Sequence, residues 1–575
     1  MVNKIIQKGK RFLTNPQESV LSAATIIMIM IVASRVLGLV RQRVLAHFFT
    51  PSELSLFFAA FRLPDLLFEI LVFGTFSSAF IPVFTKSLKK GNSHAWEIAS
   101  TVVNLGLVIF ISVALVLSIS ADKLYGLLAP GYNLADQQQI AYLARILFAA
   151  QGFFVVSYVL TGVLESLRRF LIPALAPLFY NLGIILGTLF LAPKFGLLAP
   201  VIGVVVGAFS HFIVQLPFAY AFGFRFKPKI EVNEDVRKIG RLAFPRLIET
   251  SFLQISKSAE LFFASLISVP AYTYYTFGNT LQLLPIGLFG TSIAKAALPT
   301  LARQSDDLRK FKKTLLDALY QVVFLVLPVS AALIVLRVPI VRLVYGTDIF
   351  GWEATVQTGY VLSAFGVGIV FQSANAIMAR GFYALHNTKT PVVISVGAII
   401  LTLILDYLFI RVFHFEVWGL AAALTIGVFV QSFFLFYLIN KQFGSFSLKL
   451  LKPFAKSTFA SAFSGTFMYF MLKFFDRSVW VKELSFLGRI DADKYIPFQR
   501  FVLDTRYTAN LLILTMFVLL TGAVLYIGLS IAFGSQEVWV FFNQIKRVFI
   551  RRQVAPIPKK EEEQVAPPTS DTPGL

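Results

Sequence analysis

Stretches of about 20 or more predominantly apolar residues recur along most of this 575-residue chain, and they restrict its fold more than any other feature. A helix of that length crosses the hydrocarbon core of a bilayer. Fourteen stretches can be delimited: Ser22–Phe49, Glu53–Lys86, Trp96–Ser120, Gln138–Leu167, Ile172–Ala192, Leu197–Phe222, Val236–Ser268, Ala271–Ala302, Phe311–Tyr345, Glu353–Leu385, Thr390–Phe413, Val417–Asn440, Leu451–Phe475 and Asn510–Phe533. Charged residues make up 14% of the chain, whereas soluble domains carry about 25%. We therefore predict an all-α polytopic membrane protein with 14 transmembrane helices.

The formal net charge of +22 does not indicate a nucleic-acid partner, because the Lys and Arg residues lie mainly in short loops between the apolar stretches. Such loops carry an excess of positive charge on the cytoplasmic side of a membrane. With a cytoplasmic N-terminus, the inner segments hold roughly 32 Lys and Arg residues and the outer segments roughly 12. We therefore expect both termini to be cytoplasmic, and we expect no cleaved signal peptide.

Two pairs of similar segments reveal an internal repeat. AFIPVFTK (Ala79–Lys86) is matched by AALPTLAR (Ala296–Arg303), and GVLESLRRFLIP (Gly162–Pro173) by GFYALHNTKTP (Gly381–Pro391). Both pairs are separated by about 218 residues, which predicts two pseudo-symmetric six-helix lobes. Because six is an even number, the lobes have the same orientation and are related by an axis along the membrane normal, with the substrate between them.

The repeat divides the chain into four expected parts. Residues 1–223 form the N-terminal lobe and residues 224–446 the C-terminal lobe. Residues 447–534 hold two added helices, and residues 535–575 hold an amphipathic interfacial helix followed by a Pro-rich, disordered tail.

Three arginines lie within the first apolar stretches: Arg35, Arg41 and Arg62. A cation at the centre of a bilayer is costly, so such residues usually face protein or water and have a function. The three arginines therefore predict a cavity that holds an anion. Two alternatives remain open: Arg41, like Arg43, can extend its guanidinium to the membrane surface, and the nearby acids can neutralise the arginines in structural ion pairs.

No constellation of enzyme residues is present. The chain has no cysteine and five histidines, and those histidines lack metal-ligand spacing. No glycine loop for a nucleotide phosphate occurs either, so we expect no cofactor and transport driven by an ion gradient, the membrane potential or the substrate's own gradient. Glu249, Thr402, Asp406 and Thr425 could supply the hard oxygens that a monovalent cation such as Na⁺ prefers. A buried pair with an arginine explains Glu249 equally well.

Several segments resemble one known family. They are SRVLGLVRQ (Ser34–Gln42), FRLPDLL (Phe61–Leu67), AFIPVF (Ala79–Phe84), QISKSAELFFAS (Gln254–Ser265), LPIGLFGTSIAKAALPTLAR (Leu284–Arg303) and GFYALHNTKTP (Gly381–Pro391). In this order they resemble the MurJ (MviN) family of lipid II flippases, within the multidrug/oligosaccharidyl-lipid/polysaccharide exporter superfamily.

The resemblance implies a two-lobed transporter in the bacterial cytoplasmic membrane. It would carry the undecaprenyl-pyrophosphate-linked peptidoglycan precursor, lipid II, from the inner to the outer leaflet by alternating access. The two added helices would form a groove for the lipid tail. The implied partners are lipid II, membrane lipids and, as further candidates, proteins of cell-wall synthesis.

The resemblance also assigns site residues. Arg35 and Arg41 carry over as cavity cations, and Arg62 fits a basic position in the second helix. Gln42 stands where the family has Asp, and Thr280 where it has Arg. Lys257, Arg246 and Lys295 are candidates to replace the lost positive charge.

Two alternatives to a lipid II flippase stay open. The chain could carry another polyprenyl-pyrophosphate-linked glycan, such as an O-antigen repeat unit, because the departures from the family's cavity charges bear on the substrate, although QISKSAELFFAS and GFYALHNTKTP favour lipid II. It could also be a transport-inactive scaffold, if the missing cavity charges mean that transport is lost.

Overall fold

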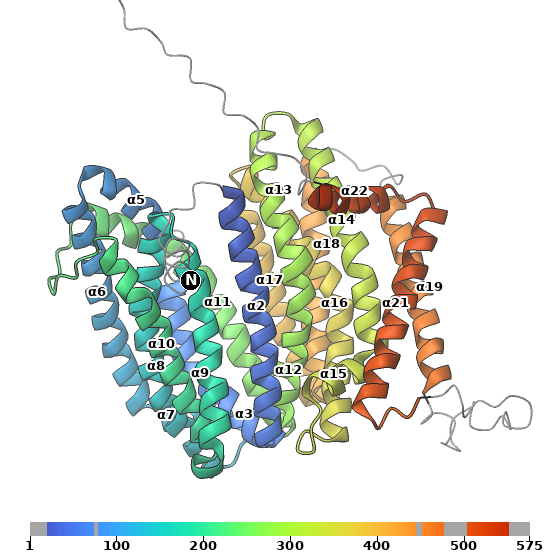
Figure 1. The fold of residues 1–575 in the computed structure, drawn as a ribbon, viewed down its shortest axis with the longest axis horizontal. Coiled ribbons are helices and arrows are strands. Elements are labelled where there is room, and N and C mark those ends of the chain that lie inside the picture. The colour runs from blue at the N-terminus through green and yellow to red at the C-terminus, as the bar shows by residue number, and fades with distance from the viewer. Residues whose placement is uncertain (1–19, 74–78, 444–450, 477–502, 551–575) are drawn as a thin grey trace, which may run out of the picture.

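The computed structural model describes residues 20–73, 79–443, 451–476 and 503–550 of the chain. Every regular element in these ranges is a helix (Figure 1). The first half contains α2 (Val20–Phe48), α3 (Pro51–Ala60), α4 (Arg62–Phe68), the π-helix η1 (Glu69–Phe73), α5 (Ile81–Lys90), α6 (Asn92–Ile119), α7 (Ala121–Leu128), α8 (Leu134–Ser166), α9 (Leu171–Phe195) and α10 (Leu198–Ala221).

The second half repeats this order. It contains α11 (Glu234–Ile267), α12 (Ala271–Pro285), the π-helix η3 (Ile286–Thr291), α13 (Ser292–Arg303), α14 (Leu308–Val335), α15 (Arg337–Tyr345), α16 (Trp352–Ala384), α17 (Lys389–Tyr407), the π-helix η4 (Leu408–Val412) and α18 (Trp418–Phe443). Three further helices follow: α19 (Lys452–Phe475), α21 (Thr508–Ala532) and α22 (Gln536–Ile550). Helix α22 lies across the ends of the neighbouring helices (Figure 1).

Ten helical segments in the described ranges are long and apolar enough to span a membrane. They coincide with ten of the fourteen predicted stretches. The other four stretches correspond to α2, to the interrupted segment from α3 onward, to the charge-bearing α11, and to α19. The all-helical membrane fold is therefore confirmed, whereas the count of 14 spans stays a prediction.

The backbone reproduces the internal repeat in detail. The π-helices η1 and η3 occupy equivalent positions in the two halves. Arg168 and His386, which lie 218 residues apart, have left-handed φ angles of 59° and 58°. Ser55 and Thr273 have the same separation of 218, and their hydroxyls are 2.9 Å apart. Equivalent residues of α3 and α12 therefore meet directly, as they must beside a two-fold axis.

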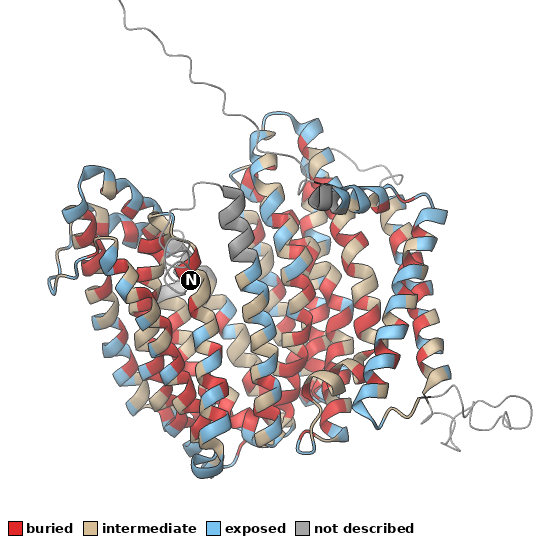
Figure 2. Ribbon diagram, viewed as in Figure 1, coloured by how far each residue is buried: buried red, intermediate tan, exposed pale blue. Residues whose placement is uncertain are grey.

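The helices at the centre of each half are the most buried. In both α8 and α16, 56% of the apolar window is buried, against 22% in α6 and α17 (Figure 2). Helices α9 and α10 pack through glycines, and a Cβ on Gly183 would lie 2.5 Å from the Gly207 Cα. Small residues of this kind let helix backbones approach closely in membranes.

The stretch from Glu53 to Lys86, predicted as one helix, is interrupted. The N-terminus of α3 is fixed by a capping box between Thr50 and Glu53. Pro64 has no N–H to donate to the Ala60 carbonyl four residues earlier. The Tyr125 hydroxyl donates to that carbonyl instead, at 2.9 Å. The break between α3 and α4 therefore has a defined partner on α7, and it points Arg62 toward the other half of the molecule.

Candidate functional site

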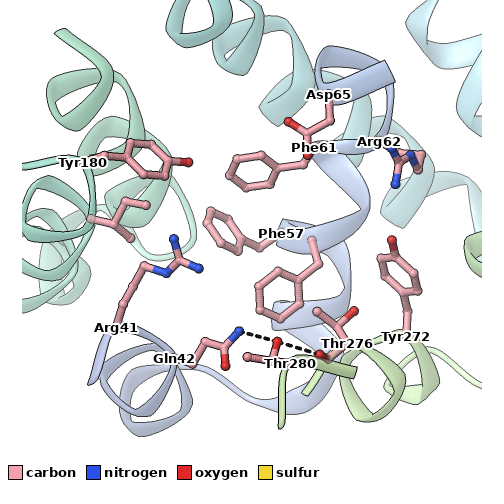
Figure 3. A pocket seen from close by; sticks show the side chains of 12 residues that line it. Arg41, Gln42, Phe57, Phe61, Arg62, Asp65, Tyr180, Tyr272, Thr276 and Thr280 are labelled. Carbon is pink, nitrogen blue, oxygen red and sulfur yellow. Dashed lines mark hydrogen bonds between the residues drawn. The ribbon is translucent and has the colours of Figure 1, made fainter. Parts of the chain in front are cut away.

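A pocket of about 320 Å³ lies where the two halves meet (Figure 3). Five helices line it, four from the first half and α12 from the second. The lining residues are Arg41, Gln42, Phe57, Phe58, Phe61, Arg62, Asp65, Tyr180, Ile184, Tyr272, Thr276 and Thr280. Apart from the tyrosines, the ionisable groups among these described lining residues are two guanidinium groups and one carboxylate.

Arg41 has no carboxylate partner in the part of the chain that the structure describes. Its side chain is half-buried, and the guanidinium extends toward the pocket opposite Phe57 (Figure 3). Tyr180 lines the same pocket, and no ion pair joins Arg41 to an acid among the residues that the structure describes. Its Nε is buried and has no hydrogen-bond partner. Arg41 is therefore available to an anion that enters the pocket.

Arg62 is tied to the second half of the molecule through a polar chain. Its side chain is buried, and Nη2 donates to Gln254 Oε1 on α11 at 2.5 Å. Gln254 donates in turn to Glu69, which forms an ion pair with Lys257 at 2.9 Å. Arg62 Nε has no partner, so this arginine keeps donor capacity toward the pocket.

Asp65 and Glu69, the two acids near the pocket in the first half, have partners other than Arg41. Gln151 Nε2 donates to Asp65 Oδ1 at 2.6 Å, and Glu69 is held by Lys257 and Gln254. The structural ion pair that the sequence left open therefore exists for Glu69, although its partner lies on α11 in the second half.

Arg35 does not line this pocket. It is exposed, and its guanidinium lies over Gly287 in η3, where a Cβ would come within 2.9 Å of Nη2. The structure thus brings Arg41 and Arg62 together and places Arg35 apart, beside the π-helix of the second half. Arg246 and Glu249 belong to α11, but their side chains lie outside the described residues.

Apart from Glu249 on α11, the predicted cation ligands lie on two adjacent helices. Thr402 and Asp406 are one turn apart on α17, and Thr425 is on α18. Each threonine hydroxyl donates to a main-chain carbonyl at 2.9 Å. Asp406 is 3% exposed, and its Oδ1 has no hydrogen-bond partner. No cluster of three or more His, Cys, Asp or Glu occurs among the residues that the structure describes.

Hydrogen bonds join the halves on one side of the pocket. Gln42 Nε2 donates to Thr280 Oγ1 at 2.9 Å, and the Tyr345 hydroxyl donates to Gln42 Oε1 at 2.9 Å. Nearer the end of the bundle, Thr273 bonds Ser55 and also donates to the Pro51 carbonyl at 2.7 Å. We call these two groups of contacts the interlobe latch. It closes the end of the molecule at which α3 begins.

The latch also explains two departures from the family pattern. The resemblance implies Asp at the position of Gln42 and Arg at that of Thr280. In this chain the two side chains bond each other, so a neutral pair stands where opposite charges would stand. One lost negative charge and one lost positive charge offset each other.

Sequence reasoning missed several residues that surround the charged groups of the pocket. Tyr180 on α9 and Tyr272 on α12 line it, and Gln151 on α8 bonds Asp65, but nothing in their local sequence marks them. Gln254 alone carried a signal, because it begins the block QISKSAELFFAS.

Two helical bundles related by an internal repeat, with a polar pocket between them, define a membrane transporter of the alternating-access kind. The fold is similar to a lipid II flippase MurJ in an inward closed conformation, with a TM-score of 0.71 and 23% identity, over 91% of this chain and 100% of that one. It is also similar to an inward-facing MATE-family multidrug resistance transporter of the MOP superfamily, with a TM-score of 0.61 and 14% identity, over 71% and 94% of the chains.

The family follows from the sequence. The lipid II flippase MurJ family model matches residues 44–488, most of the chain, and the chain belongs to this family. The probable lipid II flippase MurJ of Vibrio cholerae is 29% identical, over 73% of this chain and 83% of that one. The probable lipid II flippase MurJ of Haemophilus influenzae is 28% identical, over 80% of this chain and 96% of that one. The expectation of a transporter rather than an enzyme is confirmed by this membership.

Proposed function

We propose that this chain flips lipid II from the inner to the outer leaflet of a bacterial cytoplasmic membrane by alternating access. The family match and the names of its relatives support the substrate. The observation that carries the mechanism is the pocket between the halves, with Arg41 unpaired and Arg62 only partly satisfied. We further propose both termini on the cytoplasmic side, and the lobe boundaries 1–223 and 224–446.

The pyrophosphate of lipid II is the part that this pocket suits. Guanidinium groups bind phosphate oxygens through paired, charge-assisted hydrogen bonds. Arg41 has no carboxylate to compete with a phosphate, and the Tyr272 ring stands on the Arg62 side of the pocket (Figure 3). Asp65 limits the net charge to about +1, which favours release after transport.

Alternating access requires that the two ends of the pocket open in turn. The interlobe latch closes the end where α3 begins, so lipid II would enter from the other end. Arg35 lies apart from the pocket, against η3, and we propose that it meets the pyrophosphate on entry. Lys257, which is paired with Glu69, and Arg246 are proposed as secondary contacts that become available when the halves separate.

We propose that a monovalent cation, Na⁺ in the simplest case, is coupled to transport at Glu249, Thr402, Asp406 and Thr425. The buried, unpartnered Asp406 Oδ1 supports this proposal, because a buried carboxylate oxygen needs a cation or a donor. Driving by the membrane potential alone is the alternative.

The lipid tail is assigned to the added helices of residues 447–534. Helices α19 and α21 pack against each other and against α14, and α21 exposes large apolar side chains, among them Leu520 and Val524. Proteins of cell-wall synthesis are further proposed partners, through residues 535–575. Carriage of another polyprenyl-pyrophosphate glycan is the alternative function, and no contact in the pocket favours it.

Complementation of a bacterium depleted of its lipid II flippase tests the proposal. The wild-type chain should restore growth. Arg35→Ala should fail while the protein still accumulates in the membrane, because a lone cation contributes little to folding. Arg35→Lys should restore growth in part, since it keeps the charge and loses the paired donors. No rescue by a well-expressed wild-type chain would contradict lipid II as the substrate.

A further inference from the structure

A second pocket, of about 490 Å³, lies between the N-terminal half of α14 and the first turns of α19 and α22. It is built from helices that do not line the pocket in Figure 3, and it lies at the end of the bundle where α22 crosses (Figure 1). Its charged residues are Lys313 and Asp317 on α14, Lys452 and Lys456 on α19, and Glu537 on α22.

The lysines in this pocket are largely free to bind a ligand. Lys313 and Lys452 are exposed, and neither has a hydrogen bond or an ion pair with any residue that the structure describes. Lys456 Nζ donates to the Gly534 carbonyl at 3.1 Å, which leaves two of its three protons. Three ammonium groups against the carboxylates of Asp317 and Glu537 give the pocket a net positive charge.

The N-terminus of α22 opens into the same pocket. Ser535 stands at the position where a serine usually caps a helix, but its Oγ makes no hydrogen bond with any residue that the structure describes. Its side chain lines the pocket and is 3% exposed. A helix N-terminus has unsatisfied N–H groups and a partial positive charge, and both favour an anion. A buried hydroxyl without a partner beside these groups indicates a missing acceptor.

The surroundings of the pocket indicate that the anion belongs to a lipid. Helix α22 buries Val538 against Phe324, and it exposes Trp539 by 60% and Phe542 by 40%. An amphipathic helix with an exposed Trp lies at headgroup depth in a membrane. The pocket at its N-terminus therefore opens at the level of the lipid phosphates.

Helix α19 continues from the pocket into the apolar region along one face. Lys452, Lys456, Phe459 and Phe463 follow one another at intervals of three or four residues, so they share a side of the helix. Phe459 is 70% exposed and Phe463 61% exposed. This α19 stripe presents two ammonium groups followed by aromatic surface, the order in which a lipid presents its headgroup and its acyl chains.

We propose that this pocket binds the phosphate-bearing headgroup of an anionic phospholipid of the bilayer, with the acyl chains along the α19 stripe. The three lysines and the first N–H groups of α22 hold the phosphate, and Ser535 Oγ donates to it. This lipid is a resident one rather than the cargo, so the site is independent of lipid II transport.

Native mass spectrometry of the full-length protein, titrated with phosphatidylglycerol or phosphatidylcholine, tests the proposal. The wild-type protein should bind phosphatidylglycerol about tenfold more tightly than phosphatidylcholine. Lys452→Gln with Lys456→Gln should weaken phosphatidylglycerol binding about tenfold and remove the preference. Lys452→Arg with Lys456→Arg should retain both the affinity for phosphatidylglycerol and the preference for it over phosphatidylcholine. The matched control is Lys86→Gln with Lys89→Gln, which removes two exposed charges from α5 in the first half and should change neither.

Several results would overturn the proposal. A wild-type protein without a preference for phosphatidylglycerol contradicts it even if the glutamine variant fails to fold. Equal losses in the α5 control show a general charge effect instead of a site. Displacement of the lipid by millimolar inorganic phosphate identifies a site for a soluble anion.

Discussion

The interlobe latch makes a prediction about a single hydroxyl group, that of Tyr345. This residue is fully buried, and its hydroxyl donates to Gln42 Oε1 across the two halves. Its ring stacks on Phe277 with centroids 4.1 Å apart. Tyr345→Phe keeps the ring contact and removes the hydroxyl, which also lies 3.3 Å from the Phe277 carbonyl within the second half. Only the bond to Gln42 crosses between the halves, so the variant should weaken closure of the end where α3 begins.

The size of the shift from the closed to the open state follows from the hydrogen bond that Gln42 Oε1 loses. Gln42 is 5% exposed, so its Oε1 cannot exchange the lost donor for water while the latch is closed. An unsatisfied buried polar atom costs about 1–3 kcal/mol. Since about 1.4 kcal/mol is a factor of ten, the closed-to-open ratio at this end should fall roughly 5- to 150-fold.

Spin-label distance measurements can detect such a shift. The chain has no cysteine, so labels can be attached at Leu134→Cys and Trp352→Cys without background. These exposed residues start α8 and α16, the equivalent helices of the two halves. The longer inter-label distance should gain population in Tyr345→Phe.

Tyr526→Phe provides the matched control for this measurement. The Tyr526 hydroxyl is also buried and donates to the Phe324 carbonyl at 2.7 Å, but this bond joins α21 to α14 and not the two halves. The control should leave the distances unchanged. Identical distance distributions in Tyr345→Phe and wild type would refute the role of the latch.

Three further predictions concern other contacts. Ser55→Cys with Thr273→Cys should form a disulfide on oxidation and stop transport until it is reduced, because the native hydroxyls are 2.9 Å apart; cross-linking without inhibition would show that this end need not open. Gly183→Leu should lower the free energy of unfolding by about 1–3 kcal/mol or more, since it meets the backbone of α10; an unchanged melting temperature would disprove the close packing. Glu69→Lys should reduce transport, and adding Lys257→Glu should restore it, because the 2.9 Å ion pair is re-formed in reverse; a double variant as inactive as the single one would argue for a direct role of one residue in substrate binding.

Much of the fold was predictable because membrane helices leave a local signal. The apolar stretches marked the spans, and GVLESLRRFLIP with GFYALHNTKTP marked the repeat that the backbone of Arg168 and His386 reproduces. The interruption after Ala60 was less visible. Pro64 gave a local reason for it, but the hydroxyl that stabilises the break comes from Tyr125, which is distant in sequence.

The arrangement of the site depended on contacts between distant parts of the chain. Arg35 and Arg41 are six residues apart, about 240° around a helix, so the sequence could not place them on one face. The partner of Glu69 is 188 residues away, and that of Gln42 is 238 residues away. Read one at a time, Gln42 and Thr280 look like two lost charges. Only their contact shows that one change offsets the other.

Translocation of fluorescent lipid II in proteoliposomes tests the central claim most directly. Arg41→Ala should slow translocation roughly 10- to 150-fold, the equivalent of about 1.5–3 kcal/mol for a hydrogen bond to a charged group. Arg309→Gln, which removes an exposed charge at the start of α14 outside the pocket, should translocate at the wild-type rate. Wild-type translocation by Arg41→Ala would contradict the account, because the pyrophosphate would then be held outside the pocket between the two halves.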